Sequence, residues 1–192
     1  MGKYSGLTDL ELLRKISAQD SRALEELYDR YSSILYTLIK KIVSDESVSE
    51  IILVEVFSIV WKKAGKYDFE NGSVYTWIIT LARNKAVDNL RRTRVSADST
   101  DVYDDEYEDY FILPFLDEKI DFLDIKTAIN IKPKMAAAMN NLTDAKKYVL
   151  DLSFYQGYTP GEIAEKLKLP VEAVREKMMS AVHNLRENLL GS

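Results

Sequence analysis

The chain has 192 residues, of which 46% are hydrophobic, and a formal net charge of −5; this length suits one core of ordinary size or two small ones. With no cysteine and a single histidine, His183, the composition excludes a disulfide framework, a thiolate zinc site and a histidine-based metal site, and we expect no cofactor. Residues 1–13 lack a basic segment followed by an apolar run, and charges interrupt every later apolar stretch, so we expect a soluble cytoplasmic protein without membrane insertion.

The acidity of the chain belongs to one segment. Residues 98–124 contain eleven acidic residues and a single lysine, which gives this segment a charge of −10. Because the whole chain carries −5, the remaining residues carry +5. The negative total therefore does not exclude a protein that binds nucleic acid.

The first half of the chain is predicted to be helical, because its apolar residues recur at helical spacing and no stretch alternates as a half-buried strand would. The pattern Thr8–Glu11 is a capping box that opens a short helix to about Ala18. Asp20 or Ser21 caps the next helix, which carries one apolar stripe and should end near Ser44.

A third helix, from about Ser47 to Lys63, has apolar side chains around nearly its whole circumference. They are Val48, Ile51, Ile52, Leu53, Val54, Val56, Phe57, Ile59, Val60 and Trp61. Such a helix needs cover on two sides, and a domain of about 90 residues rarely encloses a helix completely. We therefore expect part of this surface to bind a partner; the alternative is a central core helix.

A fourth helix should run from its cap, Ser73, to about Arg92. Its carboxyl half offers cations for phosphates and polar side chains for directional hydrogen bonds: Arg83, Lys85, Arg91, Arg92 and Arg94, with Asn84, Asp88 and Asn89. Cations at a helix carboxyl end also complement the helix dipole, which would explain Arg91 and Arg92 but neither Arg83 nor Lys85.

The loop before this helix, residues 66–72, brings Tyr67 and Phe69 close to the basic surface. Aromatic faces beside cations can hold unstacked bases. Aromatic residues in loops more often cover a core, but their combination with a basic helix favours a site for single-stranded nucleic acid.

Residues 93–130 combine turn formers, the acidic run and Pro114, so we expect a linker that can include short helical pieces. Its aromatic residues indicate that it docks on another surface when functional. The chain is predicted to be helical again from Pro133, and Thr143 should cap a helix that ends at about Tyr155.

The end of the chain is predicted to form a helix-turn-helix. A capping box at Thr159–Glu162 opens a short helix to about Leu167, and Pro170 starts another after a tight turn. The second helix should present outward Glu172, Ala173, Arg175, Glu176, Lys177 and Ser180. The two carboxylates repel phosphates unless one accepts a hydrogen bond from cytosine, so base reading looks weak; the alternative is a motif used only for packing.

These residues resemble a known family, the extracytoplasmic-function (ECF) sigma factors. The segments Leu7–Arg14 and Ala23–Tyr31 look like the opening of sigma region 2, and Glu55–Phe57 with Trp61–Ala64 looks like its polymerase-binding helix. Gly72 to Arg92 is similar to the segment that melts and holds the minus-ten element, and Leu142 to Leu190 resembles region 4, which reads the minus-thirty-five element.

The resemblance implies an all-α protein of two small helical domains: region 2 over residues 1–95, an acidic linker over 96–132 and region 4 over 133–192. It implies minus-ten DNA contacts by Tyr67, Phe69, Asn71, Trp77, Arg83, Asn84, Lys85, Asp88, Arg91 and Arg92. It implies upstream DNA contacts by Thr159, Glu172, Ala173, Arg175, Glu176, Lys177 and Ser180. Polymerase contacts would come from Ile51, Val54, Glu55 and Ser58.

The implied partners are core RNA polymerase, through the clamp helices and flap of its large subunits, promoter DNA, and an anti-sigma factor or another recruiting protein. The acidic linker would thread the polymerase interior, where it resembles nucleic acid in charge. Such a protein is a transcription initiation factor and not an enzyme.

Two departures from the family pattern stand out. Ile51 and Val54 replace an Asp and a Gln that are usual in the polymerase-binding helix, which makes this interface more apolar. In the recognition helix, Glu172-Ala-Val-Arg-Glu-Lys177 replaces the usual Gly-Thr-Val-Lys-Ser-Arg. A divergent member could compensate for weak base reading if another protein, for example an RNA-guided effector, delivered it to DNA.

Two other classes of function remain open from the residues alone. One is a stand-alone helix-turn-helix regulator with a helical sensor domain, which would bind duplex DNA without polymerase. The other is a helical enzyme, which the sequence disfavours because no acid, base and nucleophile occur at sensible spacing.

Overall fold

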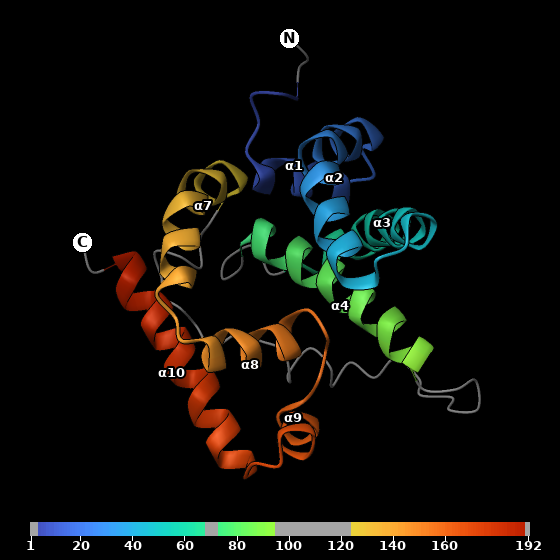
Figure 1. Cartoon of the computed structure of the whole chain (residues 1–192). Helices are drawn as coiled ribbons and strands as arrows, with labels where there is room; N and C mark the ends of the chain where they lie inside the picture. The colour runs from blue at the N-terminus through green and yellow to red at the C-terminus, as the bar shows by residue number, and fades with distance from the viewer. Residues whose placement is uncertain (1–3, 68–72, 95–123, 191–192) are drawn as a thin grey trace. The chain divides into compact units, whose positions relative to one another are not determined.

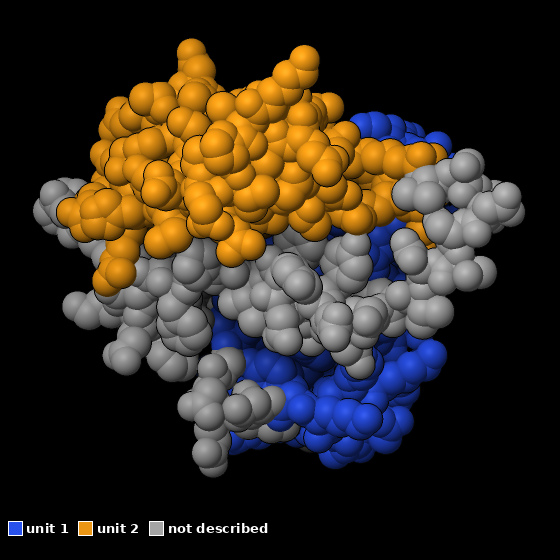
Figure 2. Space-filling view, turned by 90° about the horizontal axis from the view of Figure 1, so that it is seen from below, with its two compact units in different colours: residues 1–89, 121–128 blue, residues 90–120, 129–192 orange. Residues whose placement is uncertain are grey.

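The computed structural model describes residues 4–67, 73–94 and 124–190, and the regular elements of these segments are all helices (Figure 1). The chain divides into two compact units, residues 1–89 with 121–128 and residues 90–120 with 129–192, which Figure 2 draws in different colours. The predicted all-helical class and the presence of two helical units are confirmed. Within the described segments no helix is long and apolar enough to cross a membrane.

Helix α1, Asp9–Ser17, begins at the predicted capping box. The Glu11 amide donates to the Thr8 hydroxyl over 3.2 Å, and the Thr8 amide donates to the Glu11 carboxylate over 2.7 Å. Because both exposed amides of the first turn gain a partner, the helix starts where the sequence pattern places it.

Helix α2, Ser21–Val43, starts at Asp20, whose carboxylate accepts from the amides of Arg22 and Ala23. It ends at Ser44, which adopts a left-handed conformation with φ of 62°. The predicted apolar stripe packs into the core of the first unit through Ala23, Leu27, Tyr31, Leu35, Ile39 and Ile42.

Helix α3, Glu46–Lys63, is capped by Asp45 and runs into a short 3-10 turn, η1, Ala64–Lys66. One side of α3 is buried, through Ile52, Leu53, Val56, Phe57 and Val60. The other side is exposed, so α3 is not a central core helix. The alternative of complete enclosure is wrong for the side that carries Ile51 and Val54.

Helix α4, Val74–Arg94, follows the predicted cap, and the Thr76 amide donates to the Ser73 hydroxyl over 3.3 Å. Its amino-terminal half buries Val74, Ile78 and Leu81. The helix extends two residues beyond the predicted end, which keeps Arg94 helical.

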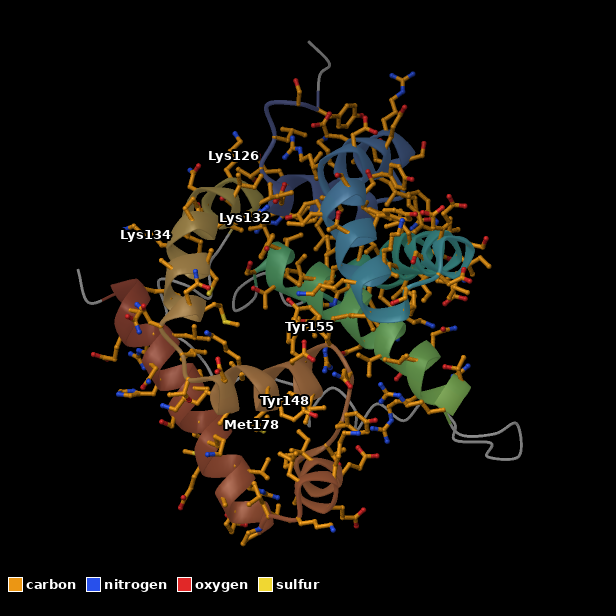
Figure 3. All side chains as sticks on the ribbon, viewed as in Figure 1. Lys126, Lys132, Lys134, Tyr148, Tyr155 and Met178 are labelled. Atoms are coloured by element: carbon orange, nitrogen blue, oxygen red, sulfur yellow. The ribbon has the colours of Figure 1, made fainter. Side chains whose placement is uncertain are left out.

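Helix α7, Ile125–Asn140, starts before the residue that the sequence predicted. The sequence placed the start of this helix at Pro133, which lies inside it. The helix starts earlier because the Thr127 amide donates to the Asp124 carboxylate over 2.7 Å, an amino-terminal cap hidden within the acidic run. Lys126, Lys132 and Lys134 lie along α7 and are exposed (Figure 3).

The helix-turn-helix of the second unit consists of α9, Pro160–Leu167, and α10, Val171–Leu190, preceded by α8, Asp144–Phe154. Its core contains Val149, Leu152, Ile163, Ala164 and Val174, with Leu167 and Met178 partly buried against them. The turn is made by Lys168 with φ of 54°, and Gly157 precedes the motif with φ of 67°. The predicted motif is therefore confirmed.

Candidate nucleic-acid interface and protein-binding surface

An exposed apolar face lies on α3. Ile51 and Val54 are 59% and 65% exposed, Glu55 is also exposed and Ser58 is half-buried. A single exposed apolar side chain is common on protein surfaces and needs no explanation. Two of them together on one face of a helix indicate a surface suited to a protein partner.

A groove borders this face. Its volume is about 460 Å³, and it lies between α2 and α3, lined by Tyr28, Ser32, Ser33, Tyr36, Glu50, Leu53 and Val54. The ring of Tyr28, one of the lining residues, lies beside that of Phe57 with centroids 4.8 Å apart. The groove extends the exposed face of α3, which carries Val54, toward α2.

The basic residues of α4 differ in exposure and in ion pairing. Arg92 is exposed, as a phosphate contact requires. Lys85 is half-buried, and its ammonium pairs with the Glu55 carboxylate of α3 at 3.2 Å. The sequence placed Lys85 and Glu55 in two separate sets of functional residues, and the structure brings them together.

Arg83 and Asn84 differ from the surface positions expected for them. They are 4% and 6% exposed, and the Arg83 guanidinium donates to the Asn84 amide oxygen over 3.1 Å. Burial lowers the pKa of Arg83 to about 10, and the negative charge of Asp88 opposes this effect. In this conformation neither side chain is exposed enough to contact DNA phosphates.

Arg91 and Arg94 belong to the part of α4 that is counted with the second unit, which begins at Leu90. Arg91 donates to the Glu162 carboxylate over 3.1 and 3.2 Å and to the Gly157 carbonyl over 2.8 Å. The Arg94 guanidinium lies 4.5 Å from the centre of the Tyr158 ring. A phosphate would therefore have to compete with Glu162 for Arg91.

The aromatic part of the candidate interface includes Tyr67 and Trp77. Their ring centroids are 5.3 Å apart at an angle of 53°, and both side chains are half-buried. This tilted pair offers ring surface beside the basic helix, as base stacking requires. Phe69 and Asn71, which were expected to contribute as well, lie outside the residues that the structure describes.

The recognition helix presents most of the expected side chains. Glu172, Arg175, Glu176 and Ser180 are exposed, while Thr159, Ala173 and Lys177 are half-buried. Met179 is 67% exposed on the same helix, a feature that the sequence analysis missed. Its signal was the spacing of seven residues from Glu172, two helical turns that return to the same face.

No group of residues that could hold a metal ion occurs in the part of the chain that the structure describes. His183 is exposed on α10.

The two units define an all-helical DNA-binding protein: a helix bundle with a basic helix, and a helix-turn-helix. Residues 27–95 match Sigma-70 region 2, and residues 138–187 match Sigma-70, region 4. The ECF RNA polymerase sigma factor SigK of Mycobacterium sp. (strain KMS) is 31% identical to this chain, and the similarity covers 96% of this chain and 92% of SigK. The chain belongs to the ECF sigma factors of the sigma-70 family.

Two further similarities are weaker. SigK of Mycobacterium bovis (strain BCG / Pasteur 1173P2) is 27% identical, with 95% of this chain and 94% of that protein covered. The solved structure of Rhodobacter sphaeroides SigE in complex with the anti-sigma ChrR is 26% identical, covers 93% of this chain and 96% of that chain, and has a TM-score of 0.47.

Family membership gives the general function. The chain directs RNA polymerase to promoters, binds RNA polymerase and DNA, and is not an enzyme. The alternatives of a stand-alone regulator and of a helical enzyme are therefore excluded.

Proposed function

We propose that α3 seats the chain on core polymerase and that α4 captures the opened minus-ten strand, while the helix-turn-helix of α9 and α10 contacts upstream duplex DNA. The observation that carries this proposal is the position of the exposed residues Ile51 and Val54 on α3, the helix that is joined to basic α4 by the Glu55–Lys85 pair. One helix offers an apolar face to a protein and the next offers cations and aromatic rings to DNA.

The polymerase contact would involve Ile51, Val54, Glu55 and Ser58 against the clamp helices. Burial of apolar surface is non-directional, whereas hydrogen bonds require a defined geometry. Ile51 and Val54 in place of polar side chains would therefore raise the affinity for polymerase but lower the specificity of the contact. This chain should therefore favour a polymerase whose matching surface is equally apolar.

Three kinds of side chain would contribute to the minus-ten contact. Lys85, Arg91 and Arg92 would neutralise phosphates, Tyr67, Trp77 and Phe69 would stack on unpaired bases, and Asn71 and Asp88 would hydrogen-bond to base edges. Arg83 and Asn84 would act from the interior by holding the helix that carries the others.

The upstream contact would come from the helix-turn-helix. Thr159, Arg175, Lys177 and Ser180 supply donors for phosphates or bases, while Glu172 and Glu176 weaken the approach to phosphates. Attachment to polymerase raises the effective concentration of this unit into the millimolar range, so modest contacts suffice. The flap of polymerase would hold the second unit near the upstream DNA.

We also propose that the chain works in the cytoplasm, that residues 96–132 pass through the polymerase interior, and that an anti-sigma factor or another recruiting protein controls it. The exposed carboxylates of Glu172 and Glu176 on α10 support a recruiting partner, because promoter choice needs another source of specificity if this helix reads bases weakly. If so, deletion of that partner should remove promoter selectivity, and unchanged selectivity would refute this part of the proposal.

The test is capture of core polymerase by the purified full chain, followed by run-off transcription from genomic fragments. We expect a stable complex and transcripts that start at defined sites. A chain that shows no affinity for core polymerase while binding intact duplex tightly by itself would refute the proposal.

A further inference from the structure

The ion pair between Glu55 and Lys85 joins the two surfaces to which different partners are assigned. A Glu55 oxygen and the Lys85 nitrogen are 3.2 Å apart, and both residues belong to the first unit. The Glu55 side chain is 50% exposed and that of Lys85 is 27% exposed, so both charged groups can be reached by a partner.

Glu55 lies on the exposed apolar side of α3, and Lys85 lies on the side of α4 that carries Arg92. Glu55 follows Ile51 by four residues on α3, which places both on one side of that helix next to Val54. Lys85 precedes Arg92 by seven residues on α4, so these two cations share a side two turns apart. The pair therefore connects the exposed apolar face with the basic face.

The two partners compete with the pair. A cation of a protein bound to α3 can approach the Glu55 carboxylate fully only if Lys85 moves away from it. A phosphate can approach the Lys85 ammonium fully only if Glu55 releases it. Each partner that arrives alone must therefore break the same ion pair.

We propose that Glu55 is a positioning residue that couples polymerase binding to DNA binding through Lys85. The inference rests on the proposed function, in which α3 binds polymerase and α4 binds the opened strand. In the free chain Glu55 holds the Lys85 ammonium away from phosphates. A cation of polymerase pairs with the Glu55 carboxylate in place of Lys85, so the DNA no longer has to break the Glu55–Lys85 pair.

This coupling is reciprocal, because the free energy of breaking the pair is spent once and assists whichever partner binds second. An ion pair at this level of exposure corresponds to a change of about two- to five-fold in an equilibrium constant. The effect should fade at high salt, where exposed charges are screened.

The test uses two single substitutions in the full chain and measures two affinities for each. E55Q removes the carboxylate, so the ion pair with Lys85 is already absent; we expect the free chain to bind a fluorescent single-stranded DNA of mixed sequence about two- to five-fold more tightly at low salt. K85M keeps the apolar stem and removes the ammonium, so Glu55 is already released. We expect this variant to bind core polymerase more tightly by a similar factor, although it binds DNA less well.

The double variant E55Q/K85M completes a mutant cycle, in which the two effects on either affinity should not add. The matched control is E46Q, which removes a carboxylate at the start of the same helix, where Glu46 pairs with Lys40. It should leave both affinities within error of the unsubstituted chain.

Two results would overturn the inference while leaving the proposed function intact, provided that the wild-type chain binds polymerase and DNA. One is a K85M variant that binds polymerase no more tightly than wild type. The other is an E55Q variant that binds DNA no more tightly than wild type. A wild-type chain that does not bind polymerase would instead overturn the proposed function.

Discussion

Tyr31 donates a hydrogen bond from its hydroxyl to a carboxylate oxygen of Asp9 over 2.6 Å, and this contact ties α2 to the first turn of α1. The Tyr31 side chain is fully buried, and burial raises the pKa of its hydroxyl well above the ordinary value. The other oxygen of Asp9 accepts from Arg30 over 2.9 Å. Two residues of α2 therefore converge on one carboxylate and fix the amino-terminal helix on the bundle.

Tyr31→Phe should lower the free energy of unfolding of the first unit by about 1.5–3 kcal/mol, because a hydrogen bond to a charged acceptor is lost in a buried place. Urea unfolding of the full chain measures the change as a lower midpoint. Tyr28→Phe is the control, since Tyr28 is 41% exposed on the same helix and should shift the midpoint little. Equal midpoints for the two variants would show that the Asp9 contact adds no stability.

Ile51→Asp and Val54→Asp should each weaken binding to core polymerase by at least about tenfold, because each removes apolar surface from the contact and adds a charge to it. Both side chains are exposed, so the fold should remain as stable as before. Binding is measured by competition for core polymerase, with Met179→Asp in the second unit as the control. Polymerase binding that survives both substitutions would exclude this face of α3 as the interface.

Replacing Arg91 and Arg92 together by alanine should reduce open-complex formation, and the loss should depend on salt. Removing two contacts to single-stranded phosphates lowers the slope of log affinity against log salt by about 1.4. Permanganate footprinting across a salt series measures the opened complex, with Lys41→Ala on α2 as the control. Normal opening by the double variant would remove both arginines from the proposed DNA contact.

Glu172→Gln with Glu176→Gln should raise the affinity of the polymerase-bound chain for upstream duplex about three- to tenfold at low salt, since two exposed charges that repel phosphates are removed. If one carboxylate accepts from a cytosine amino group, the same variant should also bind more sites with less selectivity. Sequencing of bound genomic fragments measures both. Unchanged affinity would mean that this face of α10 does not approach DNA.

Acid should weaken the capping box of α9. Burial alone would raise the pKa of Glu162, but the Thr159 amide and the Arg91 guanidinium outweigh it and lower the pKa below its ordinary value of 4.5. A carboxyl group with a lowered pKa in the folded state stabilises that state above pH 4.5 and loses this contribution as the pH falls through the lowered value.

Glu162→Gln should therefore unfold at a lower urea concentration than the unsubstituted chain at pH 7, and the difference should shrink below pH 4.5. Hydrogen exchange at the amides of α9 follows the same change locally. Glu165→Gln, an exposed neighbour on that helix, is the control. A difference that stays constant from pH 7 to pH 3 would contradict the assigned role of the Glu162 charge.

The local signals were sufficient for most helix boundaries. The capping boxes at Thr8 and Thr159 predicted the first residues of α1 and α9 because both of their partners lie within three residues along the chain. The start of α7 was missed for the opposite reason: the acidic run around Asp124 has the composition of a linker, and it concealed a carboxylate that caps a helix.

Periodicity determined which residues of α2 face the core, and the motifs determined that the chain is a sigma factor with a helix-turn-helix. Only the tertiary structure decided which functional candidates can be reached. Arg83 is buried although arginine is usually exposed, and Lys85 pairs with Glu55, thirty residues earlier in the sequence. Burial and ion pairing depend on neighbours from other helices, and the spacing of residues along one helix carries no information about them.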